Sequence, residues 1–242
     1  MRILIMSDIH GNEQALQAVL EYTYRRGDID KIILLGDVID YGMHSNEVAD
    51  ILKHLDKPVI CNISGNHEEA VLNEDYTRFS SERGKQCAGY THDSLSPETW
   101  NYIKNEMSSS GIMEFIVEGK KCLAVHGSLE DHFWKSIHPG EKDPAYQKYD
   151  YVFSGHSHLP HMFEVFYKID DPENRNKKKT VFVNPGSVGQ PRNLTPMAQA
   201  AIWETKTGEI EMKKIPYDIK KEQEAYTGQV DDFYRTRLER GI

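Results

Sequence analysis

Short apolar runs that end abruptly in polar residues, with helical segments between them, restrict the fold of this chain more than any other feature. The first half contains such runs at residues 2–6, 31–35 and 58–63, and each is followed by a polar cluster. Between the runs, apolar residues recur at helical spacing over residues 13–25 and 46–55. This alternation of strands and helices predicts parallel pairing in a sheet that is buried on both faces.

The second half of the chain has a different pattern. From Glu68 to about Met107 the strand signal is absent, and polar helices with a break near Pro97 are predicted. Apolar runs joined in part by hairpin turns then predict strands at 112–117, 121–126, 151–153, 162–169, 179–184, 198–204 and 209–215. A polar C-terminal helix is predicted from about Ile219.

No stretch rich in proline, glycine and serine interrupts the 242 residues, so a single domain is predicted over 1–242. We expect an α/β fold in which two mixed sheets pack as a sandwich flanked by helices, with a helical insert at about 68–107. The first half of the chain should be rich in parallel strand pairs and the second half in antiparallel pairs.

Charge and cysteine content exclude several classes of partner. The net charge is −9, from 29 basic and 38 acidic residues. We therefore expect neither a nucleic-acid nor a membrane partner, because both need clustered Lys and Arg, and no apolar run reaches the ~18 residues of a membrane span. Cys61, Cys87 and Cys122 are far apart, which favours free thiols in a reducing cytoplasm over disulfides or a zinc knuckle.

Metal-binding residue types follow the predicted strands, where ligands gather in open α/β sheets. The side chains with suitable donors are Asp8, His10, Asp37, Asn66, His126, His156 and His158, with His67 beside them. Oxygen and imidazole donors without thiolates suit Mn, Fe, Zn or Ni. Seven ligands are too many for one ion but fit two ions that share one bridging carboxylate, so a dimetal centre is predicted.

Five motifs in this order resemble those of the calcineurin-like metallophosphoesterase superfamily. They are Asp8-Ile9-His10, Gly36-Asp37-Val38-Ile39-Asp40, Gly65-Asn66-His67-Glu68, His126 after a strand, and Gly155-His156-Ser157-His158. The segment Val183–Arg192 further resembles the compact bacterial and archaeal phosphodiesterases of that superfamily. The resemblance spans about Met1 to Arg192 and implies the four-layer αββα fold of the family.

The resemblance also implies a role for each motif residue. Asp8, His10 and His158 would hold one divalent ion, Asn66, His126 and His156 a second, and Asp37 would bridge them. Manganese is the favoured metal, with iron, zinc or nickel as alternatives. His67 would be the catalytic histidine that faces the substrate, and Asp40 the residue that orients it.

The predicted reaction is hydrolysis of a phosphate ester, with a phosphodiester favoured, by attack of a hydroxide that bridges the two metals. The substrate would be a small phosphorylated molecule such as a nucleotide. Arg192 is the candidate clamp for a phosphate group, since a guanidinium fork matches phosphate oxygens. Asn12 would either contact the phosphate or cap the first helix.

Several alternatives remain open at this stage. A phosphomonoesterase or a protein phosphatase could use the same centre, although Asp40-Tyr41-Gly42 departs from the Asp-Arg-Gly of the serine/threonine phosphatases. A non-catalytic scaffold would be expected to have lost metal ligands. A nuclease would need a basic surface, and Lys177-Lys178-Lys179 is instead predicted to be a solvated hairpin loop. The stretch 128–149 would form either an aromatic cap over the metals or a small core.

Overall fold

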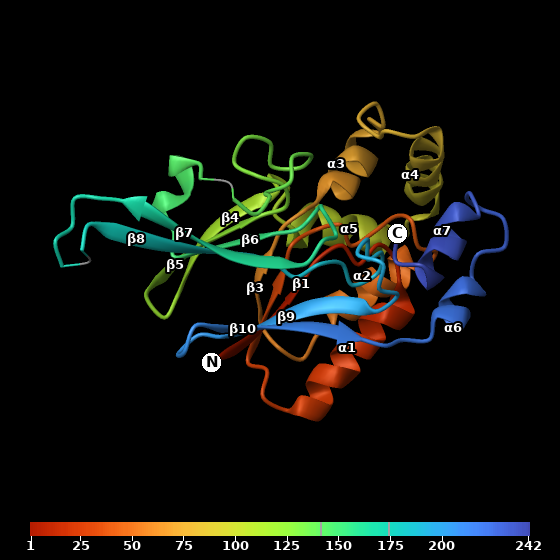
Figure 1. Ribbon diagram of the computed structural model, residues 1–242. Helices are drawn as coiled ribbons and strands as arrows, with labels where there is room; N and C mark the ends of the chain where they lie inside the picture. Colours follow the sequence, from red (N-terminus) through yellow and green to blue (C-terminus); the bar gives the residue numbers. More distant parts are fainter. Residues whose placement is uncertain (141, 174) are drawn as a thin grey trace.

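Two five-stranded sheets stack on one another in the computed structural model, which describes residues 1–140, 142–173 and 175–242 (Figure 1). One apolar cluster lies between them and draws members from both sheets, among them Ile3, Ile33, Phe153 and Val183. The predicted sandwich of two mixed sheets flanked by helices is therefore confirmed.

The first sheet has the strand order β10-β9-β1-β2-β3. Its strands are β1 (Arg2–Met6), β2 (Lys31–Leu34), β3 (Val59–Asn62), β9 (Ala198–Glu204) and β10 (Glu209–Ile215). β1 pairs in parallel with β2, and β2 with β3, whereas β9 pairs antiparallel with both β1 and β10. Ile3 and Ile5 of β1 face the other sheet and Leu4 and Met6 face the helices, because successive side chains of a strand point to opposite faces.

The second sheet has the order β4-β5-β6-β8-β7. Its strands are β4 (Ile112–Val117), β5 (Lys120–Val125), β6 (Tyr151–Ser154), β7 (His161–Lys168) and β8 (Lys177–Asn184). The pairs β5–β6 and β6–β8 are parallel, and β4–β5 and β7–β8 are antiparallel. Lys177, Lys178 and Lys179 open strand β8 and do not form a loop.

As predicted, the strands of the first half pair in parallel, and among the strands of the second half three antiparallel pairs (β4–β5, β7–β8 and β9–β10) outnumber two parallel pairs (β5–β6 and β6–β8). Each sheet nevertheless has two parallel and two antiparallel pairs, because strands of the second half also join the first sheet. The chain returns to the first sheet with β9 and β10. All residues of β9 except the last are buried, so this strand needs a position that is covered on both faces. The place beside β1 provides that cover, with α1 on one side and the second sheet on the other.

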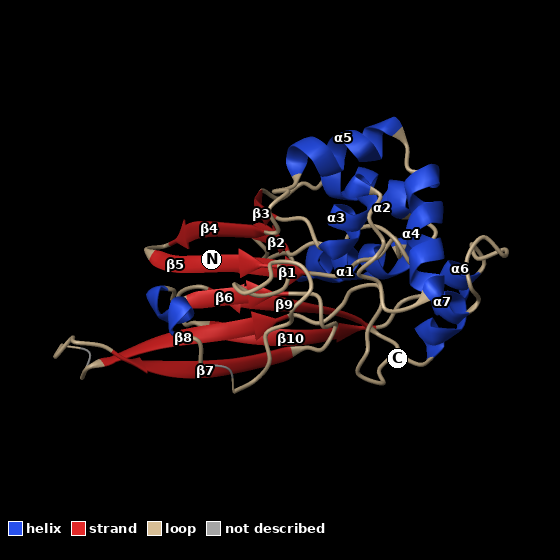
Figure 2. Cartoon of the chain, turned by 90° about the horizontal axis from the view of Figure 1, so that it is seen from above, coloured by secondary structure: helices blue, strands red, loops and turns tan. Residues whose placement is uncertain are grey.

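Helices pack against the outer face of the first sheet, because their apolar side chains share one buried cluster with Leu4, Met6 and Ile32 of that sheet. Figure 2 shows these helices gathered toward one end of the strands. They are α1 (Glu13–Arg26), α2 (Ser45–Lys53), α3 (Asn66–Asn73), α4 (Glu82–Ser94) and α5 (Pro97–Glu106). The last three form the predicted helical insert, and Pro97 opens α5, where its missing N–H leaves no intrahelical bond unmade. None of the helices in the described ranges has the length and apolar character that a bilayer span requires.

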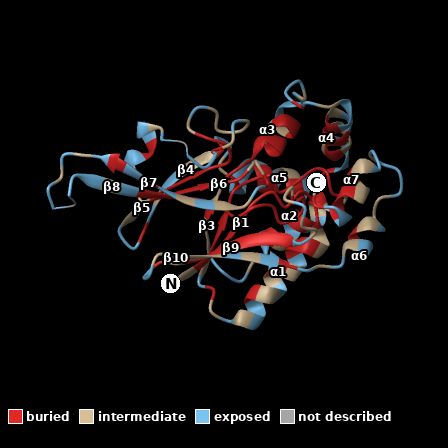
Figure 3. Ribbon diagram, in the orientation of Figure 1, coloured by how far each residue is buried: buried red, intermediate tan, exposed pale blue. Residues whose placement is uncertain are grey.

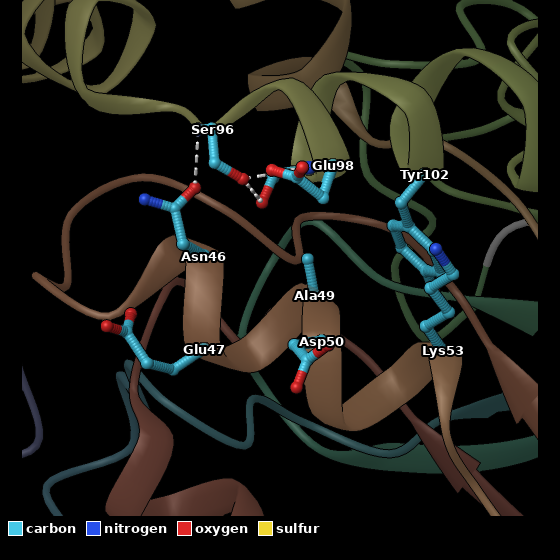
Figure 4. Close-up of a pocket in the computed structure, with 9 residues that line it drawn as sticks. Asn46, Glu47, Ala49, Asp50, Lys53, Ser96, Glu98 and Tyr102 are labelled. Atoms are coloured by element: carbon cyan, nitrogen blue, oxygen red, sulfur yellow. Dashed lines mark hydrogen bonds between the residues drawn. The ribbon is translucent and has the colours of Figure 1, made fainter.

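A groove of about 300 Å³ lies between α2 and α5 (Figure 4). Asn46 joins the two helices, since its Oδ1 accepts a hydrogen bond from the Ser96 N–H and its Nδ2 donates to the carbonyl of Ser94. These bonds position the helical insert. None of the predicted site residues lines this groove, so the groove is separate from the candidate site.

The predicted C-terminal helix begins at Ile219 but is not continuous. The chain forms α6 (Ile219–Gln223), α7 (Phe233–Thr236) and the short 3-10 helix η2 (Arg237–Glu239). Gly228 between them has φ of 100°, a left-handed backbone conformation that cannot continue a right-handed helix. The break turns α7 back toward the strand ends (Figure 1).

The described residues of the segment 128–149, which are 128–140 and 142–149, include the 3-10 helix η1 (Pro144–Lys148) and pack with apolar side chains against the second sheet. Tyr146 and Tyr149 are buried in a cluster with Phe182, as the small-core alternative requires. Trp134 instead lies at the strand ends beside His156. In the strands, every residue of β6 is buried, as are all residues of β1 except the first and all of β9 except the last (Figure 3).

Candidate metal centre

All seven side chains predicted as metal ligands gather at one end of the sandwich, in the segments that follow the strands. Asp8 and His10 follow β1, Asp37 follows β2, Asn66 opens α3 after β3, His126 follows β5, and His156 and His158 follow β6. Both sheets therefore contribute to one site, because their parallel strands end at the same edge of the sandwich.

The backbone is left-handed at five of these positions. The φ angle is 54° at Asp8, 50° at His10, 53° at Asp37, 63° at His156 and 56° at His158. Residues other than glycine adopt this conformation at a cost of about 1–3 kcal/mol each, and such residues cluster at functional sites. The rest of the fold must therefore stabilise this concentration of strained residues.

The first group of ligand atoms comes from Asp8, His10, Asp37 and His158, and these atoms lie within 4.8 Å of one another. Nε2 of His10 is 3.1 Å from Nε2 of His158, and the latter is 3.3 Å from Oδ1 of Asp8. Oδ2 of Asp37 is 3.6 Å from Nε2 of His10. Such separations are expected between ligands of one ion bound at about 2.0–2.2 Å.

The second group comes from Asp37, His126 and His156, with Asn66 beside them. Nε2 of His126 is 3.2 Å from Oδ2 of Asp37 and 3.1 Å from Oδ1 of Asn66. The same amide oxygen is 2.8 Å from Nδ1 of His156. Asp37 belongs to both groups, which is the position that the resemblance predicts for a bridging carboxylate.

Backbone carbonyls fix the orientation of all four histidines. The Nδ1–H of His10 donates to the carbonyl of Ile39 at 3.1 Å, and that of His126 donates to Leu35 at 2.7 Å. The Nδ1–H of His158 donates to Gln190 at 2.6 Å, and the Nε2–H of His156 donates to Trp134 at 3.1 Å. A carbonyl can only accept, so one ring nitrogen of each neutral histidine carries the proton and the other presents a lone pair to the centre. Metal-binding histidines are held in this way in proteins.

The two carboxylates are buried and incompletely partnered. Asp8 and Asp37 are almost inaccessible, and Oδ2 of each accepts no hydrogen bond from the described residues. Burial raises the pKa of Asp8 to about 7, with His126 opposing and Asp37 adding to the shift. Burial also opposes ionisation of Asp37, but the charges of His126 and His67 hold its pKa well below the ordinary value.

His126 supplies the positive charge that these carboxylates need. Burial disfavours its charged form, but Asp37 and Asp8 outweigh that effect and raise its pKa to about 9. A divalent cation would replace this proton, since metal binding requires a deprotonated imidazole. Buried carboxylate oxygens without partners and inward-facing imidazole lone pairs therefore fit a pair of divalent ions, and the absence of thiolates suits Mn, Fe, Zn or Ni.

Glu68 supports the site, although the sequence analysis assigned no role to it. Its buried carboxylate accepts hydrogen bonds from the N–H groups of Asp37, Val38, Ile39 and Gly65 at 2.7–3.1 Å. The bond to Gly65 caps α3, and a glutamate three residues after a cap position is a signal visible in the sequence. Glu68 therefore ties the loop after β2 to the start of α3.

His67 lies beside the metal-ligand groups with a different partner. Its Nδ1 is 2.6 Å from Oδ2 of Asp40, whose Oδ1 accepts a hydrogen bond from Thr91 at 2.7 Å. Burial opposes the charged form of His67, but Asp37 and Asp40 outweigh it and raise the pKa above its ordinary value. The structure thus brings His67 and Asp40 together as predicted.

A cavity of about 400 Å³ opens beside the centre. Asp37, Asn66, His67, His156 and His158 lie in its wall together with Arg192, the predicted phosphate clamp. Trp134, from the stretch predicted as an aromatic cap or a small core, also lies in the wall, as do residues that the sequence analysis missed: Arg78, Phe79, Arg83, Phe233, Tyr234 and Arg237. These residues lie in helices and loops without a recognisable motif, so no sequence signal distinguishes them.

Asn12 is a helix cap. Its Oδ1 accepts a hydrogen bond from the Ala15 N–H at 3.0 Å, and its Nδ2 donates to the Gly189 carbonyl at 2.9 Å. The side chain is buried and does not line the cavity. Of the two roles predicted for Asn12, the structure supports capping of α1.

Residues 1–208 match the model of the calcineurin-like phosphoesterase superfamily domain, and the chain belongs to this superfamily. It is 31% identical over 226 residues to the uncharacterized protein MJ0912 of Methanocaldococcus jannaschii, covering 92% of this chain and 90% of that protein.

Two solved structures resemble the whole chain. A metallophosphoesterase from Sphaerobacter thermophilus is 27% identical, covers 100% of both chains and superposes with a TM-score of 0.74. The hypothetical protein PH1004 from Pyrococcus horikoshii is 18% identical, covers 100% of this chain and 98% of its own, and superposes with a TM-score of 0.81. The latter likeness concerns the fold alone.

Proposed function

We propose that the protein is a hydrolase that cleaves phosphodiesters of small molecules, with two divalent ions, foremost manganese, as cofactors. The observation that carries this proposal is the convergence of carboxylate, amide and imidazole donors on two adjoining groups that share Asp37. The preference for a diester rests on the resemblance of residues 183–192 to the compact phosphodiesterases.

In this proposal Asp8, His10 and His158 hold one ion, Asn66, His126 and His156 hold the other, and Asp37 bridges them. Two bound ions would supply a water of lowered pKa and neutralise the phosphoryl oxygens. The carbonyl-bound protons of the histidines keep their lone pairs aimed at the centre.

His67 acts as the proton donor to the leaving oxygen. Asp40 accepts a hydrogen bond from the Nδ1–H of His67 and so holds the imidazole ring with Nε2 free for the substrate. Asp37 and Asp40 outweigh burial and raise the pKa of His67 above its ordinary value, which favours the charged form of the ring. A charged imidazole can donate a proton or stabilise the negative charge on the phosphoryl group. Arg192 lines the same cavity and binds phosphate oxygens of the substrate.

Particular residues argue against the alternative functions. A non-catalytic scaffold would not require the complete set of buried carboxylates and strained ligand residues. A nuclease surface built on the lysines of β8 is disfavoured because Lys178 pairs with Asp150 and Lys179 with Glu164. We propose the cytoplasm as the location, from the cysteine pattern alone.

The proposal is tested with chelator-treated protein reconstituted with Mn²⁺. We expect release of nitrophenol from bis(4-nitrophenyl) phosphate, and faster release than from 4-nitrophenyl phosphate. Asp37→Asn should abolish turnover, whereas Asp56→Asn, at an exposed aspartate outside the site, should not change it. Failure to hydrolyse either compound with Mn, Fe, Zn or Ni would overturn the enzyme proposal, and a faster monoester reaction would overturn the diester preference.

A further inference from the structure

One wall of the cavity comes from outside the part of the chain that matches the family. The family model ends at residue 208, yet Phe233, Tyr234 and Arg237 line the cavity. Tyr234 stacks on Tyr41 with ring centroids 4.7 Å apart, and Tyr226 donates to the carbonyl of Tyr41 at 3.1 Å. The C-terminal segment is therefore packed against the loop that follows β2 and contains the candidate ligand Asp37. It adds side chains to the cavity that the superfamily domain does not supply.

The wall of the cavity carries an excess of positive charge. Arg83, Arg192 and Arg237 all line the cavity, and none of them makes an ion pair with an Asp or Glu side chain of the described residues, although Arg237 donates to the main-chain oxygen of Ile242. Arg78 differs from them because it pairs with Asp131 at 2.7 Å. Three cations thus face one cavity in a chain whose net charge is −9.

Aromatic packing holds two of these cations in place. The guanidinium carbon of Arg83 lies 4.0 Å from the centroid of the Phe233 ring, and that of Arg237 lies 5.0 Å from the same centroid. Arg237 is only 6% exposed, and its Nε donates to the main-chain oxygen of Ile242 at 2.5 Å. Phe233 therefore keeps both guanidinium groups at one side of the cavity without neutralising them.

Arg192 connects this pair to the metal centre. Burial lowers the pKa of Arg237 to about 10, and the charge of Arg192 adds to the shift. Arg192 lines the same cavity as the candidate metal ligands His156 and His158 and as Arg237. Its own Nε is buried and has no hydrogen-bond partner among the described residues.

Unpaired arginines in a shared cavity repel one another and are costly to desolvate unless an anion binds them. Guanidinium forks match phosphate oxygens in charge and in geometry. We propose that Arg83, Arg192 and Arg237 form a second anion subsite, which binds a further phosphate of the substrate while the metal centre acts on the scissile one. The inference rests on the proposed function and narrows it to phosphate esters that carry at least two phosphate groups, such as diphosphate-linked molecules.

The test compares two chromogenic esters that differ by one phosphate, the 4-nitrophenyl esters of AMP and of ADP. With the Mn²⁺-loaded enzyme, kcat/KM should be about tenfold or more higher for the ADP ester, as expected for a charge-assisted phosphate contact. Arg237→Gln and Arg83→Gln should each lower the ratio of the two kcat/KM values toward one. The control Arg235→Gln changes an arginine of α7, next to η2, that pairs with Asp232 and does not line the cavity, and it should leave the ratio unchanged.

Exposed Arg83 provides the safer variant if Arg237→Gln fails to fold, since Arg83 is on the surface of α4. Equal kcat/KM values for the two esters in the wild type, or ratios unaffected by both variants, would overturn the subsite. An equal loss of kcat/KM for both esters in these variants would also overturn the subsite, because it indicates that the arginines have a general structural role.

Calorimetric binding of α,β-methylene-ADP and AMP separates the subsite from the proposed function. If neither ester is hydrolysed but the diphosphate analogue binds more tightly and loses this advantage in Arg83→Gln, the subsite stands and the hydrolase proposal fails. If neither ester is hydrolysed and the two nucleotides bind equally, both proposals fail.

Discussion

His67 and the candidate metal ligands show how one residue type takes two roles according to its partner. The four histidines of the metal-ligand groups donate a proton to backbone carbonyls, which leaves a neutral nitrogen for a metal. His67 contacts the carboxylate of Asp40 instead, and that negative charge stabilises an imidazolium. The partner atom therefore separates proton-transfer chemistry from metal binding within a single cluster of rings.

Replacement of His67 tests this separation. His67→Ala should lower turnover by about 10²–10⁴, the usual contribution of a general acid, and should leave the metal content of the protein unchanged. Metal analysis by mass spectrometry, together with steady-state kinetics on bis(4-nitrophenyl) phosphate, gives both quantities. The exposed His54 provides the control, and His54→Ala should change neither. Loss of metal in His67→Ala would show that His67 is a ligand and not the proton donor.

At the scale of elements, the positions of the strands and of the site could be predicted from the sequence. β1, for example, is a buried run that ends at Met6, and the polar residues Asp8 and His10 after it follow from the position of strand ends in an α/β sheet. The sheet to which β9 belongs could not be predicted, because its apolar pattern fits any doubly covered position. Arg83 and Arg237 also escaped prediction, since only the tertiary fold brings α4 and η2 to the cavity.

The contact of α6 with α2 gives a pH-dependent contribution to stability. Nδ1 of His44, just before α2, is 3.1 Å from Oε1 of the fully buried Glu222 in α6. This hydrogen bond is the main cause that raises the pKa of His44 above 6.5. A histidine with a raised folded-state pKa contributes stability that is complete below the unfolded pKa and is lost as the pH rises through the folded pKa.

We therefore expect His44→Gln to lower the free energy of unfolding more in acid than in alkali. The extra loss at about pH 5.5, relative to about pH 9, should be about 0.5–1 kcal/mol, since the pair is only partly shielded from solvent. Urea denaturation at both pH values measures it. In the Glu222→Gln background the same histidine substitution should show no such pH dependence. A larger loss at high pH would contradict the assigned ion pair.

At the scale of the whole molecule, the two sheets and the C-terminal segment meet at the candidate centre. Asp8 comes from the first sheet and His126 and His156 from the second, while Tyr234 from the C-terminal segment stacks on Tyr41 of the loop after β2. Ions bound there would join parts of the chain that are far apart in the sequence. Metal binding should therefore stabilise the entire domain, because the unfolded chain cannot bring these ligands together.

The last prediction concerns this coupling. Addition of Mn²⁺ to chelator-treated protein, at about one hundred times its dissociation constant, should raise the free energy of unfolding by about 2.7 kcal/mol. For a domain of this size that corresponds to an increase in Tm of about 5–10 °C, measurable by scanning calorimetry. Asp37→Asn should remove most of the increase, because Asp37 belongs to both ligand groups, whereas Asp56→Asn should retain it. An increase that persists in Asp37→Asn would place the bound ion elsewhere, and the absence of any increase in the wild type would contradict the metal centre itself.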